Sequence, residues 1–122
     1  MLNVTTTAPN HLHLHLEGRL DADAMKVGLD ALIEQSAEVT NGRLLYTVDG
    51  DFQMPTPGAL MFELGRLPSL FALLHRYDRC AVVAPQAWVR AMAEAEGHIL
   101  PGIDIKAFEP GDRAAAEAWL AG

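Results

Sequence analysis

The chain has 122 residues, of which 50% are hydrophobic and 20% are charged. This predicts one folded domain over residues 1–122 and excludes a disordered tail. Nine basic against 16 acidic side chains give a net charge of −7, and no basic cluster is present, so nucleic acid is not expected as a partner.

No apolar run reaches the roughly 18 residues of a membrane span, and residues 1–10 lack the features of a signal peptide. The single cysteine, Cys80, cannot form an internal disulfide. We therefore expect a cytoplasmic protein.

The chain begins with a predicted β-hairpin. Residues 2–7 are rich in threonine and suit a strand, and Ala8-Pro9-Asn10 suits a turn. Residues 11–16 alternate strictly between histidine and leucine, which places the leucines on one face of a half-buried strand and the histidines on the other.

A helix and a buried strand are expected next. Apolar residues recur at helical spacing from Asp21, and Asn41-Gly42 ends this segment. The nearly continuous apolar run over residues 43–49 predicts a strand that is covered on both faces and lies centrally in the sheet.

Thr56 and Pro57 predict the start of an unusually apolar helix, because a hydroxyl caps free amides and proline suits the first turn. Pro68 interrupts this helix, and a second short helix follows up to His75. The remaining elements are a strand over 79–84, a helix from Pro85 to Gly97, a strand over 103–108, and a helix over 111–120 with Ala115, Ala118 and Trp119 inward. The order is therefore ββαβααβαβα, which predicts an α/β fold with a partly parallel sheet.

In this order the chain resembles the SpoIIAA-like family, which is related to the STAS domains of anti-sigma-factor antagonists and, more distantly, to the lipid-carrying Sec14/CRAL-TRIO fold. Four stretches carry the resemblance: Leu14 to Leu20, Pro57 to Leu60, Arg79 to Val83 leading to Trp88, and Ala118-Trp119-Leu120. The resemblance implies a mixed sheet of four or five strands with helices mainly on one face.

In anti-sigma-factor antagonists a serine that follows an aspartate at the end of the central strand is phosphorylated, and this switches partner binding. Here Asp49 matches the aspartate, but Gly50 and Asp51 follow it, so no serine stands at the position of the phosphorylated residue. The nearest hydroxyl at the helix start is Thr56, which is a candidate phosphoacceptor because a helix N-terminus favours an anion. The alternative for Thr56 is an ordinary helix cap.

Three histidines on one strand face, His11, His13 and His15, are the candidates for a metal site. Side chains two apart on a strand lie about 7 Å from each other, so a His-x-His pair can hold one ion. Glu17 continues the same face. The alternative is a face exposed to solvent or used for self-association, and no metal centre is predicted from spacing alone.

The helix pair over residues 58–75 carries more apolar side chains than one helix face buries. The alternatives for what covers the excess are the protein's own core, a second copy of the chain, or an apolar ligand. We expect a binding surface made of Phe52, Met54, Thr56, Leu60, Met61, Phe62, Leu64 and Leu67.

No phosphate loop, zinc-protease motif, nucleophile elbow or Cys-x-x-Cys pair is present, so neither an enzyme nor a cofactor is predicted. The predicted function is a binding or regulatory module that acts by protein–protein association, including self-association, with a homodimer favoured. The alternative is a carrier or sensor of an apolar small molecule or lipid at the same surface. A third is a metal- or pH-responsive module that uses the histidine strand.

Overall fold

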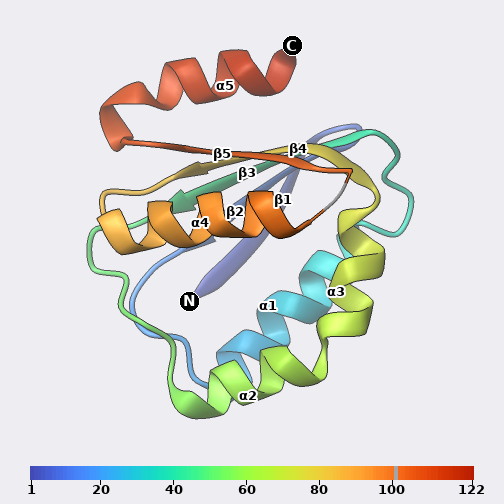
Figure 1. Ribbon diagram of the computed structural model, residues 1–122. Helices are drawn as coiled ribbons and strands as arrows, with labels where there is room; N and C mark the ends of the chain where they lie inside the picture. Colours follow the sequence, from blue (N-terminus) through green and yellow to red (C-terminus); the bar gives the residue numbers. More distant parts are fainter. Residues whose placement is uncertain (101) are drawn as a thin grey trace.

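The computed structural model describes residues 1–100 and 102–122 and shows a five-stranded sheet covered on both faces (Figure 1). Its elements are β1 (Leu2–Ala8), β2 (His11–Leu16), α1 (Ala22–Gln35), β3 (Gly42–Val48), α2 (Pro57–Gly65), α3 (Leu67–Leu74), β4 (Tyr77–Val83), α4 (Ala87–Ile99), β5 (Asp104–Phe108), a 3-10 turn (Pro110–Asp112) and α5 (Arg113–Ala121). The predicted order of strands and helices is confirmed. Among the described residues, no helix is both long and apolar enough to cross a lipid bilayer.

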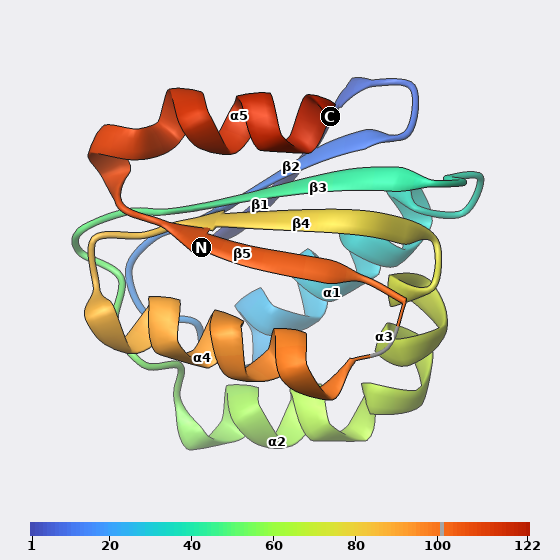
Figure 2. The same ribbon diagram turned by 45° about the horizontal axis from the view of Figure 1, so that its top comes forward.

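The strands lie side by side in the order in which they occur along the chain, β1-β2-β3-β4-β5 (Figure 2). β1 and β2 form the predicted antiparallel hairpin, and β2, β3, β4 and β5 are mutually parallel. β3 is therefore the central strand, as its apolar run predicts.

Two apolar cores lie on opposite faces of the sheet. Helices α1 to α4 cover one face and α5 alone covers part of the other (Figures 1 and 2), which confirms that the helices lie mainly on one side. The larger core lies beneath α1 to α4 and includes Leu12, Leu14 and Leu44. The smaller core, beneath α5, is made of Leu45, Ala81, Val83, Ala116 and Leu120. Alternation along β3 sends Leu44 to one core and Leu45 to the other.

Two arginines of the sheet fix the end of α5. The Arg43 Nε donates to the carbonyl of Leu120 at 2.8 Å, and the Arg79 Nη1 donates to the carbonyl of Trp119 at 2.6 Å. Cations at the end of a helix stabilise its free carbonyls. The buried residues of α5 are Ala116 and Leu120, so the prediction that Ala115 and Ala118 point inward is wrong, and Trp119 is only half-buried. The alanines on this helix carry no pattern that distinguishes one face from another.

Three predicted helix boundaries are also wrong. α1 ends at Gln35 and not near Asn41-Gly42. The next residue, Ser36, is buried and directs its hydroxyl to that of Tyr77 at 2.6 Å, which fixes the end of the helix against β4. The later Gly42 instead allows a close approach, since an added Cβ there would lie 2.7 Å from the Tyr77 ring.

The break between α2 and α3 lies at Arg66 and not at Pro68. Pro68 occupies the first turn of α3, where its missing N–H costs nothing. Similarly, α4 continues past Gly97 to Ile99. An added Cβ at Gly97 would lie 3.3 Å from the Cβ of Ile105, so this glycine allows close packing of α4 on β5.

Candidate functional site

α2 and α3 form the outer wall of the larger core. The Thr56 hydroxyl accepts a hydrogen bond from the Ala59 amide at 3.2 Å and so caps α2, and Pro57 occupies the first turn. An ion pair between Arg66 and Asp30 at 2.8 Å connects the α2–α3 junction to α1. The same guanidinium lies 4.9 Å from the centre of the Phe62 ring, a cation–π distance.

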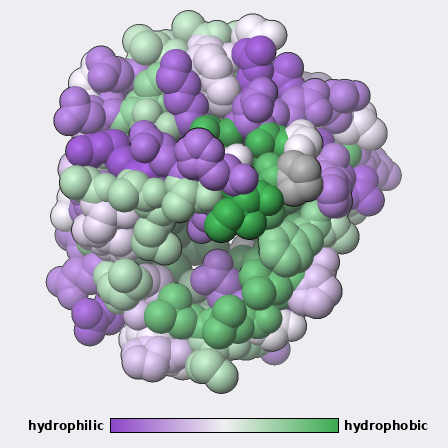
Figure 3. Space-filling view, in the orientation of Figure 1, coloured by the Kyte–Doolittle hydropathy of each residue, from purple (hydrophilic) through white to green (hydrophobic). Residues whose placement is uncertain are grey.

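Large apolar side chains remain exposed on these helices. Met61 is 68% exposed and Leu64 is 57% exposed, and Ile99 on α4 is 75% exposed. Figure 3 shows apolar side chains gathered over α2, α3 and the end of α4, around a hollow. We define the apolar surface as Met54, Leu60, Met61, Leu64, Phe71 and Ile99, which are all exposed. Large exposed apolar side chains gathered on one face make this surface a candidate interaction site.

The residues predicted from the sequence for this surface occupy three different depths. Met54, Leu60, Met61 and Leu64 are exposed; Thr56, Phe62 and Leu67 are half-buried; Phe52 is buried. The Phe52 ring stacks on that of Trp88 with centroids 5.9 Å apart. Phe52 therefore supports α4 from beneath and is not available to a partner.

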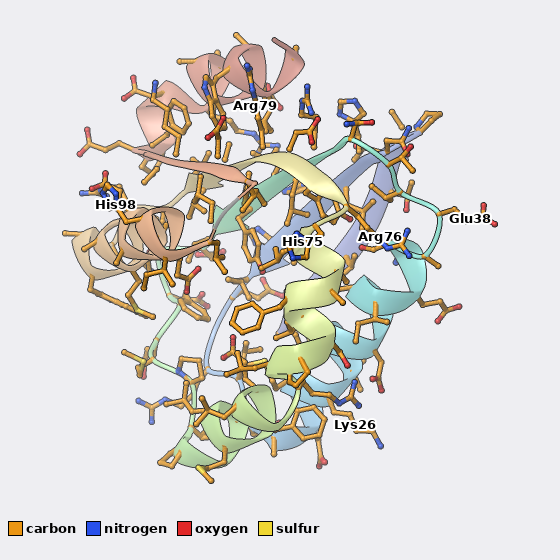
Figure 4. The ribbon with its side chains drawn as sticks, turned by 45° about the vertical axis from the view of Figure 1, so that its right-hand side comes forward. Lys26, Glu38, His75, Arg76, Arg79 and His98 are labelled. Carbon is orange, nitrogen blue, oxygen red and sulfur yellow. The ribbon has the colours of Figure 1, made fainter. Side chains whose placement is uncertain are left out.

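Next to the apolar surface, α3 and α4 enclose a recess of about 230 Å³. Its lining residues are Phe71, Leu74, His75, Ile99, Leu100 and Ile103, and Figure 4 shows His75 at the end of α3. Sequence reasoning included Phe71 and Leu74 in the apolar helix pair but missed the α4 half of the recess. The only available signal was the apolar pair Ile99-Leu100 after Gly97, and nothing in the sequence brings it to α3.

Ionisable groups also lie between α2, α4 and the sheet. Desolvation raises the pKa of Glu63 on α2. The pKa of Glu96 on α4 is raised by desolvation and then by the charge of Glu63. Burial raises the pKa of Tyr46 on β3 above its ordinary value, and both glutamates add to this rise. Glu63 and Tyr46 are half-buried and Glu96 is exposed, so the two carboxyl groups and the Tyr46 hydroxyl influence one another across α2, α4 and β3, and Glu63 is the more desolvated of the two glutamates by exposure.

Cys80 on β4 behaves as the sequence predicts for a core residue. It is buried, and burial together with the charge of Glu96 raises its pKa to about 12. Arg79 extends to the opposite face of the sheet, toward α5 (Figure 4). A thiol in this setting is not a nucleophile at neutral pH.

The histidines of β2 lie on the face of the sheet that carries α5, but among the described residues the three do not form a group that could share one metal ion. The Nε2 of His13 and the Nδ1 of His15 each lie 2.7 Å from the hydroxyl of Thr47 on β3. Desolvation lowers the pKa of His13, with smaller contributions from the positive charges of Arg113 and His15, while Glu117 acts in the opposite direction.

The fold and this arrangement can be compared with known proteins. The SpoIIAA-like family model matches residues 11–121. The chain belongs to the SpoIIAA-like family. No curated protein matches the chain.

Three solved structures similar to this SpoIIAA-like chain are each 15% identical to it and cover 98% of it. One is an uncharacterized protein of the DUF3478 family from Shewanella loihica PV-4 with a SpoIIAA-like fold, with a TM-score of 0.73 over 92% of that protein. The second is the anti-sigma factor antagonist SpoIIAA in its unphosphorylated form, with a TM-score of 0.54 over 98% of that protein. The third is the Bacillus cell fate determinant SpoIIAA in its phosphorylated form, with a TM-score of 0.56 over 99% of that protein. At this identity the likeness shows a shared fold.

Proposed function

We propose that residues 1–122 act as one non-catalytic binding module that docks another protein, including a second copy of itself, on the apolar surface. The observation that carries the proposal is the exposure of Met61, Leu64 and Ile99 around a recess that the protein does not fill. Apolar side chains left in water contribute about 25 cal/mol of binding free energy for each Å² that a partner covers.

The size of the recess supports a protein side chain as its occupant. Pockets that bury a small-molecule ligand measure roughly 300–1,000 Å³, and the recess between Phe71 and Ile99 measures about 230 Å³. A single apolar side chain projecting from a partner helix fits such a space, and anchors of this kind provide much of the binding energy of protein interfaces. The likeness to SpoIIAA, an anti-sigma factor antagonist, also supports a role in binding protein.

Sedimentation equilibrium of the purified chain tests self-association first. We expect a dimer for the native sequence and a folded monomer for Leu64→Glu, because a buried unpaired carboxylate is costly at an interface. Ala115→Glu is the control: Ala115 is exposed on α5, on the other face of the sheet, so this variant should remain dimeric. A native monomer, or dimers for both variants, would reject self-association through this surface.

A second candidate is the binding of a small apolar molecule that carries a polar group. The observation that favours it is the presence of the half-buried Glu63 on α2 beside the apolar surface. Burial raises the pKa of this carboxyl, and the pKa of Glu96 on α4 is also raised, so protonated carboxyl groups there can donate as well as accept hydrogen bonds. Native mass spectrometry of freshly purified protein separates the candidates. A constant added mass that is lost on denaturation supports a ligand, whereas a doubled mass with no addition supports the dimer.

A further inference from the structure

A histidine and two carboxylates meet where β2 and β3 end, on the side of the sheet that carries α5. Single ligand atoms of His15, Glu17 and Asp49 all lie within 4.8 Å of one another. The Nε2 of His15 is 4.0 Å from Oε2 of Glu17. Among the described residues this is the one group of three or more histidine, cysteine or acidic side chains close enough to share a metal ion.

Strand register explains why these three residues meet. β2 and β3 are parallel, with His15 opposite Thr47 and Leu16 opposite Val48. Glu17 and Asp49 are the next residues of their respective segments, and the Asp49 amide donates to the Leu16 carbonyl at 2.8 Å. Residues two apart on a strand share a face, so the register sends all three side chains to the same side. In open α/β sheets, the carboxyl ends of adjacent parallel strands are where ligands bind.

Hydrogen bonds from outside the group orient two of the three side chains. The Nδ1 of His15 bonds to the hydroxyl of Thr47, a buried residue, which leaves Nε2 directed toward Glu17. The Asp51 amide donates to Oδ1 of Asp49 at 3.2 Å, and the Gln86 side chain donates to the Asp49 carbonyl at 2.8 Å. Metal-binding histidines commonly use the second ring nitrogen in this way, which fixes the ring and its tautomer.

Glu17 and Asp49 approach each other, and among the ion pairs of residues 1–100 and 102–122 neither is joined to a lysine or an arginine. The Met1 ammonium donates to the backbone carbonyl of Glu17, but it forms no ion pair with the carboxylate of Glu17 or Asp49 among the described residues. A divalent cation would relieve the repulsion between the two carboxylates.

We propose that His15, Glu17 and Asp49 bind a divalent transition-metal ion, with water in the remaining positions. One imidazole nitrogen and two carboxylate oxygens suit Zn²⁺, whose ligand distances of about 2.0–2.2 Å place neighbouring ligand atoms roughly 3.4 Å apart. The Glu17 side chain is 44% exposed and can move to close the gap. The bound ion connects the segment after β2 to the segment after β3, and His11 and His13 are not ligands.

Isothermal titration of the full chain, free of any affinity tag and stripped of metal, with ZnCl₂ at pH 7.5 tests this site. We expect one saturable equivalent. His15→Ala and Asp49→Asn should each weaken binding about tenfold or more. Asp49 is exposed and asparagine has nearly the same shape as aspartate, so Asp49→Asn should fold normally and guards against a loss of binding caused by misfolding. His11→Ala, on the same strand face, is the matched control and should bind as the native chain does.

Two results would overturn the proposal. One is the absence of saturable binding up to about 1 mM Zn²⁺. The other is equal binding by the native chain, His15→Ala and Asp49→Asn. As a second readout, Mn²⁺ should selectively broaden the amide NMR signals of residues 15–17 and 47–49. Broadening centred on residues 11–13 would place the ion elsewhere and reject the assignment. Both measurements are independent of the oligomeric state and of the apolar surface.

Discussion

Replacing Tyr77 with phenylalanine removes one half of a hydrogen bond that lies wholly inside the protein. The Tyr77 hydroxyl lies 2.6 Å from the Ser36 hydroxyl, and the two residues are 0% and 1% exposed. No water can replace the lost partner, so Tyr77→Phe should lower the free energy of unfolding by about 1–3 kcal/mol, the cost of a buried group left unpaired. Ser36→Ala should cost a similar amount, because it leaves the Tyr77 hydroxyl unpaired.

The double variant Ser36→Ala/Tyr77→Phe decides whether the hydrogen bond is responsible. With both hydroxyls removed nothing remains unpaired, so its cost should be well below the sum of the two single costs, with a coupling energy of about 1–2 kcal/mol. Urea unfolding followed by circular dichroism measures all four proteins. In thermal unfolding, 1 kcal/mol corresponds to about 4 °C for a chain of this length, at about 2.1 cal/mol/K of unfolding entropy per residue. Strictly additive costs, or a Tyr77→Phe cost below about 0.5 kcal/mol, would refute the reasoning.

Three further predictions concern packing, pH and thiol reactivity. Gly28→Ala should destabilise the protein by about 1–3 kcal/mol in urea unfolding, because the added Cβ would overlap the side chain of Leu2, whose Cβ would lie only 2.8 Å away. Gly58→Ala, with 3.7 Å of clearance, should not destabilise it, and equal effects would contradict this packing. The raised pKa of Glu63 means that the folded state holds its proton more tightly than the unfolded state, so stability should fall as pH rises from the ordinary glutamate value through the raised one. Glu63→Gln should therefore be more stable than the native chain at pH 8 and show a flatter pH profile, whereas an unchanged profile would show that Glu63 is not desolvated. Cys80, with a pKa of about 12, should resist iodoacetamide at pH 8 until the protein is unfolded; rapid modification of the folded chain, followed by mass spectrometry, would show that the thiol is accessible.

Local patterns in the sequence were sufficient for most of the sheet. The alternation of residues 11–16 and the apolar run of residues 43–49 identify a half-covered strand and a central strand, because side-chain burial in a strand depends on its own period. Helix ends were predicted less well. Pro68 and Gly97 interrupt helices in isolation, but here one lies in a first turn and the other allows contact with β5.

The candidate sites show the same division between local and distant information. Met61 and Leu64 were predicted to be available to a partner because the excess of apolar residues is local to α2. Phe52 was included with them because its stacking partner, Trp88, lies 36 residues further along the chain. Similarly, the histidine alternation suggested three ligands on one strand, while the register with β3 groups His15 with Asp49. Neither pairing can be derived without the three-dimensional contacts.

Because the spatial order of the strands equals their order along the chain, every strand after the first pairs with a neighbour that precedes it in the sequence. No strand has to be inserted between two that are already paired, and each addition closes only the loop or helix that connects it to the strand before. Such a sheet can grow by one strand at a time from the N-terminal hairpin, which keeps the entropy cost of each closure small. A partly formed sheet on this route is a shorter version of the final one, with β1 at one edge and the strand added last at the other.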